Sequence, residues 1–381
     1  MLCRRSRSLS SEKGDCCSAA HQRIGHGVAW GPKSALRRVL FVLLVIQTAV
    51  PAAWAWGARV HRMLTDLALA GLPADAPEWL RSPETSARAA FQSNQPDRWR
   101  GWNSLELRHA NEPEHYLDVE ELDQFGLTLE TIPNLRGEYL RVLAVAKYVH
   151  PEQIAPYDAA KDPARTHEWP GFVLHAAAER YAKLQAAFQQ VRILEKLNRP
   201  ALRMQLDEAR GLAIFEIGEL SHFITDIGQP LHTTRHYDGW LGDNPAGYKW
   251  RAKFHAYIDE GFADQHKLDE SALKPRVKYG ATVNAADPWE DVVAYLRRSH
   301  ALMEPLYALE RDGKLDGPDG EALIVGQMND AASTLSALIW AAYTSAEPTD
   351  KQVESWARYD ASEPRAGAGA TQPSTQPAAT K

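Results

Sequence analysis

Cysteine is absent from most of this 381-residue chain, because Cys3, Cys16 and Cys17 all lie within the first 55 residues. The remainder cannot be cross-linked by disulfides, which commonly stabilise proteins outside the cytoplasm. Any cross-link between distant segments must therefore come from another source. Metal binding is one such source, because one ion holds ligands from several segments together.

Long hydrophobic runs are missing too. The most apolar stretch, VLFVLLVIQTAV at Val39 to Val50, is too short to cross a membrane but has the length of a signal-peptide core. Two arginines precede it, and the small-residue pattern AWA ends at Ala55. We therefore expect cleavage after Ala55, Trp56 as the mature N-terminus, and a secreted or periplasmic protein. A start codon assigned too far upstream would explain residues 1–36, and a long leader is the alternative.

Positive charge is scarce once the leader of residues 1–55 is removed. That leader contains eight of the 43 basic residues and two of the 49 acidic residues, so the mature chain has a net charge of −12. An acidic surface repels polyanions, which argues against a protein that holds long nucleic acid through its backbone. A site where bound cations supply positive charge locally remains compatible with this composition. No stable protein partner is expected.

Strand-like alternation of apolar and polar residues is also absent, whereas helical periodicity recurs along the chain. We expect an all-α fold with a single helical-bundle domain over residues 56–346. Residues 74–133 predict short helices joined by loops, and residues 347–381 predict a disordered tail rich in Pro, Gly, Thr, Gln and Ala. The longer helices are expected at about 56–72, 134–150, 171–198, 201–227, 249–267, 287–307 and 321–345.

The segment SHFITDIGQPLHTTRHYD, residues 221–238, concentrates side chains that bind metals. In the predicted helix, His222 and Asp226 lie one turn apart and opposite the apolar stripe. Pro230 ends the helix, so the chain can fold back and bring His232 beside them. Two imidazoles and a carboxylate suit tetrahedral zinc. For the pair His222 and Asp226 alone, the alternative is a buried ion pair with a polar cap.

Similar side chains recur elsewhere in the chain. His255 and Asp259 form a second pair four residues apart on one helix face, and His61 lies five residues after the expected mature terminus. Asp97 and His115 belong to the region of short helices. These residues are further candidate ligands.

The order of these residues resembles the single-strand-specific zinc nucleases of the S-one/P-one type and their relatives, the zinc-dependent bacterial phospholipases C. The likeness is carried by WGARVH at 56–61, HYLD at 115–118, SHFITDIGQPLH at 221–232 and HAYID at 255–259. It spans most of the mature chain and implies the helical fold of that superfamily with three zinc ions. The implied ligands are Asp97, His115, His222 and Asp226 for one ion, His232, His255 and Asp259 for another, and His61, Asp226 and the terminal amine and carbonyl of Trp56 for the third.

Two features depart from the pattern. In a phospholipase-like register, Arg251 would take the place of a histidine and His255 that of a glutamate, so Asp259 is a ligand only in the nuclease-like register. His236, four residues after His232, competes with Asp259 for the second site. The remaining histidines of the mature chain are expected to be structural or solvated.

The resemblance implies an exported zinc phosphodiesterase that hydrolyses single-stranded RNA or DNA, or nucleotides. Asp118, three residues after His115, would orient water, or alternatively cap a helix entry. Aromatic residues near the ligands, among them Trp240, would stack a base, with arginines 98, 100 and 235 available to bind phosphate. A phospholipase C acting on phospholipid is the alternative within this class. A catalytically inert zinc-binding structural protein is the alternative outside it.

Overall fold

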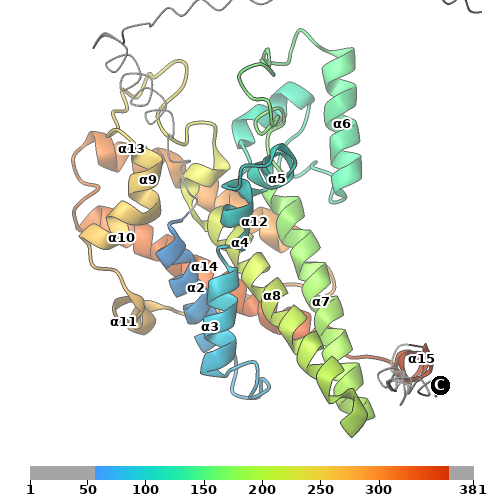
Figure 1. Cartoon of the computed structure of the whole chain (residues 1–381). Helices are drawn as coiled ribbons and strands as arrows, with labels where there is room; N and C mark the ends of the chain where they lie inside the picture. Colours follow the sequence, from blue (N-terminus) through green and yellow to red (C-terminus); the bar gives the residue numbers. More distant parts are fainter. Residues whose placement is uncertain (1–55, 360–381) are drawn as a thin grey trace, which may run out of the picture. The chain divides into compact units, whose positions relative to one another are not determined.

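The computed structural model describes residues 56–359 (Figure 1). The expected leader, its cleavage point after Ala55 and the tail beyond residue 359 lie outside the described residues. Helices are the only regular elements of the described part, apart from an isolated bridge between Leu117 and Gly171. The prediction of an all-α fold is therefore confirmed.

Four helices form the centre of the fold. α7 packs along α8, and α14 packs against both of them and against α2. None of the helices within residues 56–359 combines the length and apolar character needed to cross a membrane. The bounds of the four are α2 (Ala58–Ala70), α7 (Val173–Leu197), α8 (Arg203–Gly228) and α14 (Pro318–Ser345).

Shorter helices and single turns surround this centre. The helices are α3 (Pro83–Gln92), α4 (Gln95–Arg100), α5 (Leu105–Asn111), α6 (Arg136–Val149), α9 (Phe254–Ala256), α10 (Phe262–Gln265), α11 (Glu270–Leu273), α12 (Trp289–His300), α13 (Met303–Arg311) and α15 (Asp350–Tyr359). The turns are η1 (Glu112–His115), η2 (Val119–Phe125), η3 (Pro200–Leu202), η4 (Pro230–Thr233), the π-helical η5 (Tyr257–Gly261) and η6 (Lys274–Arg276).

α8 runs through the interior, and all of its residues from Glu216 to Gly228 are buried. The second half of this helix therefore has no solvent-facing side. Gly218 allows α3 to approach it closely, because a β-carbon there would lie 2.5 Å from Cβ of Gln92 and 2.8 Å from the carbonyl oxygen of Ala89. The close approach places the chain that follows α3 directly against the second half of α8.

Two of the predicted helices are broken. A helix over 287–307 is wrong, because α12 ends at His300 and α13 begins at Met303. Pro305 explains the break, since inside a continuous helix it would remove a hydrogen bond and clash with the preceding turn, whereas it fits the first turn of α13. A helix over 249–267 is also wrong. Regular structure begins only after Lys253, whose φ of 58° is left-handed, and it then changes to the π-helical turn η5.

The predicted disordered tail is wrong for residues 350–359, which form α15 and pack on α7. A capping box begins this helix: the amide of Gln352 donates to Oγ1 of Thr349 at 3.3 Å, and the amide of Thr349 donates to Oε1 of Gln352 at 2.8 Å. The pattern T-x-x-Q was present in the sequence, but the composition of the flanking residues obscured it.

Candidate metal centre

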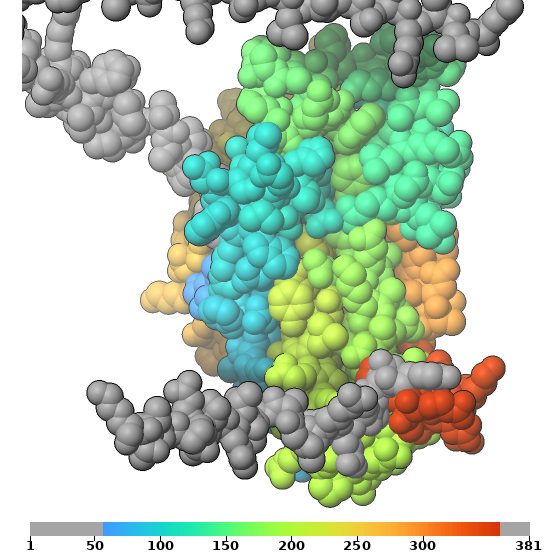
Figure 2. Space-filling view, turned by 45° about the vertical axis from the view of Figure 1, so that its right-hand side comes forward, coloured from blue at the N-terminus to red at the C-terminus, as the bar shows by residue number. Residues whose placement is uncertain are grey.

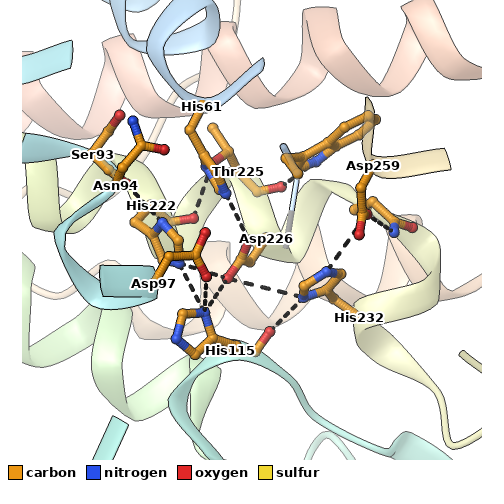
Figure 3. A network of polar contacts seen from close by, with 12 residues as sticks. His61, Ser93, Asn94, Asp97, His115, His222, Thr225, Asp226, His232 and Asp259 are labelled. Carbon is orange, nitrogen blue, oxygen red and sulfur yellow. Dashed lines mark hydrogen bonds and ion pairs between the residues drawn. The ribbon is translucent and has the colours of Figure 1, made fainter. Parts of the chain in front are cut away.

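The structure brings together every predicted ligand side chain at one place, and Figure 3 labels all of them except His255. They come from separate elements: His61 from α2, Asp97 from α4, His115 from η1, His222 and Asp226 from α8, His232 from η4, and His255 and Asp259 from α9 and η5. All eight side chains are buried. Residues that lie up to about two hundred positions apart in the sequence therefore form one compact cluster.

Asp226 lies at the middle of the cluster, between histidines from three segments (Figure 3). Its Oδ2 is 3.1 Å from Nδ1 of His115 and 3.3 Å from Nε2 of His222. Its Oδ1 is 3.4 Å from Nε2 of His61. The two oxygens thus face different histidines, as a carboxylate that bridges two metal ions must do. Asp97 completes this part of the cluster, with Oδ1 at 3.9 Å from Nδ1 of His115.

His232, His255 and Asp259 form the second part of the cluster. Nε2 of His255 is 3.4 Å from Oδ2 of Asp259, and Nε2 of His232 is 3.9 Å from Oδ1 of the same carboxylate. The π-helical turn η5 contains Asp259, and π-helical turns often occur at functional sites. The structure therefore places Asp259, as in the nuclease-like register, beside both histidines.

Trp56 lies against both parts of the cluster. Its buried indole donates to the carbonyl of Thr225 at 2.8 Å, next to Asp226 in the chain. The amide of Gly57 donates to the carbonyl of Asp259 at 3.0 Å, which brings the main chain of Trp56 beside the second part. Trp56 is therefore held beside the cluster through its indole and through the next residue in the chain.

Three of the histidines use Nδ1 for a hydrogen bond to a neighbouring residue, and their Nε2 therefore faces the cluster. Nδ1 of His222 donates to the carbonyl of Ser93 at 2.7 Å, and Nδ1 of His232 donates to the carbonyl of His115 at 2.7 Å. Nδ1 of His61 lies 2.6 Å from Oγ1 of Thr225. Histidines that bind metals are oriented in this way, because the second hydrogen bond fixes the tautomer and the ring.

The residues fit metal ions by two criteria. First, several buried ligand atoms have no hydrogen-bond partner among the described residues, although buried polar atoms are normally paired. Second, in a tetrahedral zinc site with bonds near 2.1 Å, neighbouring ligand atoms are separated by about 3.3 Å, close to the distances around Asp226 and within the pair His255 and Asp259. The ligand side-chain atoms without a hydrogen bond are Nε2 of His61, His115 and His232, both ring nitrogens of His255, both carboxylate oxygens of Asp97, Oδ1 of Asp226 and Oδ2 of Asp259.

Burial also sets the protonation of the ligands. It holds the pKa of His61, His115 and His255 well below the ordinary value, so these rings are neutral near pH 7. Burial also acts against a charged His222 and is the largest single effect, but the combined attraction of Asp226, Asp97 and the carbonyl of Ser93 outweighs it and raises the pKa of that ring. Neutral imidazole is the form that binds a metal. His61, His115 and His255 are therefore already in that form, whereas burial raises the pKa of Asp97 and Asp259, which a bound cation would oppose.

Gln229 orients the carboxylate of the second part. Its Nε2 donates to Oδ1 of Asp259 at 2.7 Å, while its Oε1 accepts from the amide of Leu231 at 2.6 Å. We expect Gln229→Leu to weaken zinc binding at His232, His255 and Asp259 by about 10–100-fold, because outer hydrogen bonds contribute that much to metal affinity. Competition with a chromogenic chelator measures the zinc affinity of the variant.

Gln327→Leu is the matched control for this prediction. Gln327 is also buried and donates to the carbonyl of Gly228 at 2.9 Å, but it contacts no ligand carboxylate. Gln229→Leu should bind zinc more weakly than Gln327→Leu, while the free energy of unfolding should fall by a similar amount in both variants. Equal zinc affinities would contradict the role given to Gln229.

The structure does not bring His236 or Arg251 into the cluster. His236 stacks on Trp240 with ring centroids 4.2 Å apart, and its Nδ1 accepts from the amide of Leu241. Arg251 forms ion pairs with Glu310 and Asp316. The alternatives in which His236 is a ligand, or Arg251 occupies a ligand position, are therefore wrong.

A cavity of about 140 Å³ opens onto the cluster. Its wall includes His115, His232 and His255 from the cluster, together with Arg100, which was expected near the site, and Tyr237. Sequence reasoning missed the rest of the wall, because these side chains come from loops and short turns whose course no local pattern predicts. Those residues are Glu112, Tyr116, His167, Leu231 and Thr234.

Asp118 also lines this cavity. It occupies the first position before η2, but its side chain makes no capping hydrogen bond, so the interpretation as a helix cap is wrong. Burial raises the pKa of its carboxyl group well above the ordinary value, repulsion from Glu121 and Glu120 adds to the shift, and Arg235 opposes it. A proton on Asp118 would make it a hydrogen-bond donor toward the cavity.

Searches of protein-family models and of curated proteins found no match to this chain. The function is therefore inferred from the geometry of the cluster and its cavity.

Proposed function

We propose that the protein is an exported, zinc-dependent phosphodiesterase that hydrolyses single-stranded nucleic acid through a centre of three metal ions. The observation that supports this most strongly is the convergence of buried, unpaired ligand atoms from four histidines and three aspartates beside an open cavity. An inert structural zinc site would be closed by its protein ligands, whereas these ligands border space for water and substrate.

Zinc ions bound there would supply Lewis acidity toward phosphoryl oxygens and lower the pKa of water toward neutrality. The residues of the chain supply the rest. Arg100 lies at the cavity wall, 2.9 Å from Oδ1 of Asp97, and adds positive charge where a phosphate would bind. Asp118 faces the same cavity and would orient water or a polar group of the substrate.

The aromatic residue best placed to stack on a base is Tyr237. It lines the cavity, its side chain is partly exposed, and its ring is 5.5 Å from that of His255. Trp240, which the sequence suggested, is instead packed between His236 and Tyr248. Replacing Trp240 is therefore expected to affect stability rather than substrate binding.

One feature of the cavity favours phospholipase C as the second candidate. The carboxylate of Glu112 lies in the same wall as Tyr116 and Tyr237. Aromatic faces beside negative charge bind quaternary ammonium groups such as choline. The wall could therefore accept a phosphocholine headgroup as well as a base.

A parallel assay of one zinc-loaded sample separates the candidates. We expect release of nucleotides from single-stranded DNA and RNA, at rates above those for duplex DNA, because stacked bases cannot enter the cavity. Release of phosphocholine from phosphatidylcholine without nucleotide release would show a phospholipase C. No hydrolysis of either substrate by a protein with full zinc content would show an inert zinc protein.

The third metal site gives a prediction about processing. A terminal amine at Trp56 can bind a metal only if cleavage occurs after Ala55. Mass spectrometry of the exported protein should therefore find Trp56 as its first residue, and a form retaining an extra N-terminal methionine should bind one zinc ion fewer. A mature protein that begins elsewhere would remove the amine from the proposed centre.

A further inference from the structure

A second hollow lies outside the metal centre, between α3 and α8, with a volume of about 270 Å³. Figure 2 looks onto the face where the blue and cyan surface of α3 and α4 lies beside the yellow-green surface of α8. Ile214 and Phe215 line the hollow from α8, and Phe91 lines it from α3. Phe91 is 54% exposed, so part of its ring is open to solvent. We call this hollow, with Arg98 at its edge, the α3–α8 groove.

Arginine side chains border the groove. The guanidinium of Arg98 lies 4.2 Å from the ring centroid of Phe91, and its Nη1 donates to the carbonyl of Phe91 and to Oε1 of Gln95. This arrangement holds the guanidinium flat against the ring while Nη2 and Nε make no hydrogen bond with the described residues. Arg62 on α2 is exposed and close enough to repel Arg98, and it forms no ion pair within residues 56–359. Glu84 also lines the groove, but it pairs with Arg88 at 3.5 Å. Arg98 and Arg62 are therefore two neighbouring cations without an ion pair of their own among the described residues, and such a pair of cations favours an anion.

The helix α4 connects the groove to the metal centre. Asp97 is directed toward the cluster and Arg100 toward the cavity, whereas Arg98, between them in the chain, faces the groove. The edge of the groove at Arg98 is therefore only two residues along the chain from the cavity wall at Arg100. A flexible chain bound at the centre could therefore pass around α4 and reach the groove.

We propose that the α3–α8 groove binds the single-stranded nucleic acid beyond the scissile bond, with a base stacked at Phe91 and a phosphate at Arg98 and Arg62. This inference rests on the proposed nuclease function and extends it from nucleotides to longer strands. An aromatic face beside unpaired guanidinium groups is the combination that binds single strands without sequence preference. The positive charge is local, so it is compatible with a mature chain whose net charge is −12.

The test compares substrate length. A tri-thymidylate and an oligo-thymidylate of about 15 nucleotides are hydrolysed by zinc-loaded protein, and the KM of each is measured for Phe91→Ala and Arg98→Ala. We expect KM for the longer strand to rise about tenfold with little change for the trimer, because one stacked base contributes that much to binding. For Arg98→Ala, the slope of log affinity against log salt should also fall by about one.

Controls separate this inference from the proposed function. Arg141→Ala is the matched control, since Arg141 is an exposed arginine on α6 that pairs with Glu138 of the same helix. Zinc content shows that each variant retains its metal centre. Anisotropy of a labelled, slowly cleaved phosphorothioate strand measures binding independently of turnover.

Equal KM values for the variants and the wild-type protein on the longer strand would overturn the inference while leaving the nuclease function intact. An equal rise in KM for the trimer and for the longer strand would also overturn it. The substitutions would then have disturbed the metal centre, not a separate binding surface for the strand. A wild-type protein that hydrolyses neither strand would contradict the proposed function itself. In that case the anisotropy comparison still decides whether the groove binds nucleic acid.

Discussion

Asp226→Asn is expected to reduce bound zinc from three ions to one and to lower hydrolysis by at least about a thousandfold. Asp226 is fully buried, and each of its oxygens faces different histidines: Oδ1 faces His61, and Oδ2 faces His115 and His222. Asparagine has nearly the same shape but no charge, and its amide nitrogen is a donor that cannot bind a metal. The ion held by His232, His255 and Asp259 would remain.

Elemental analysis of the purified variant measures the loss. His236→Gln is the control, because His236 is a buried histidine near the cavity that is not part of the cluster. It should retain three zinc ions. Full zinc content in Asp226→Asn would show that Asp226 does not bridge two ions.

Removal of zinc by a chelator is expected to lower Tm by at least about 10 °C. The described chain has no disulfide to join its segments, while the cluster joins α2, α4, η1, α8, η4 and η5. Without metal, the buried carboxylates of Asp97 and Asp259 have oxygens without hydrogen bonds, which costs folding free energy. Ions that bind only the folded state stabilise it in proportion to their affinity.

Differential scanning calorimetry with and without chelator measures this shift. Zinc added back should restore the original Tm, and the same chelator should shift the Asp226→Asn variant less, since that variant holds less metal. An unchanged Tm after complete loss of zinc would mean that the cluster is stabilised by its own hydrogen bonds and ion pairs.

The long helices could be predicted from sequence because each combines apolar periodicity with clear end signals. α7 and α8 begin and end within about two residues of the expected positions. Helical spacing predicted the pairs His222 with Asp226 and His255 with Asp259, whereas the rest of the ligand set was implied by the family resemblance. Their meeting in space follows once α8 and the turn at Pro230 are formed.

Other features depended on contacts that no local pattern contains. In the π-helical turn η5, the carbonyl of Asp259 accepts a hydrogen bond from the amide of Gly57, about two hundred residues earlier in the chain. No local sequence periodicity predicts this turn. His167 reaches the cavity from the loop before α7, where it stacks on Tyr116 with ring centroids 5.3 Å apart. The exposure of Phe91 likewise depends on how α3 packs on α8.

The most direct test is a crystal structure of the mature protein, prepared without chelator, with anomalous diffraction measured on both sides of the zinc absorption edge. The account predicts three anomalous peaks: one among Asp97, His115, His222 and Asp226, one among His232, His255 and Asp259, and one among Trp56, His61 and Asp226. An ordered cluster with these side chains in direct contact and no anomalous peak would contradict it.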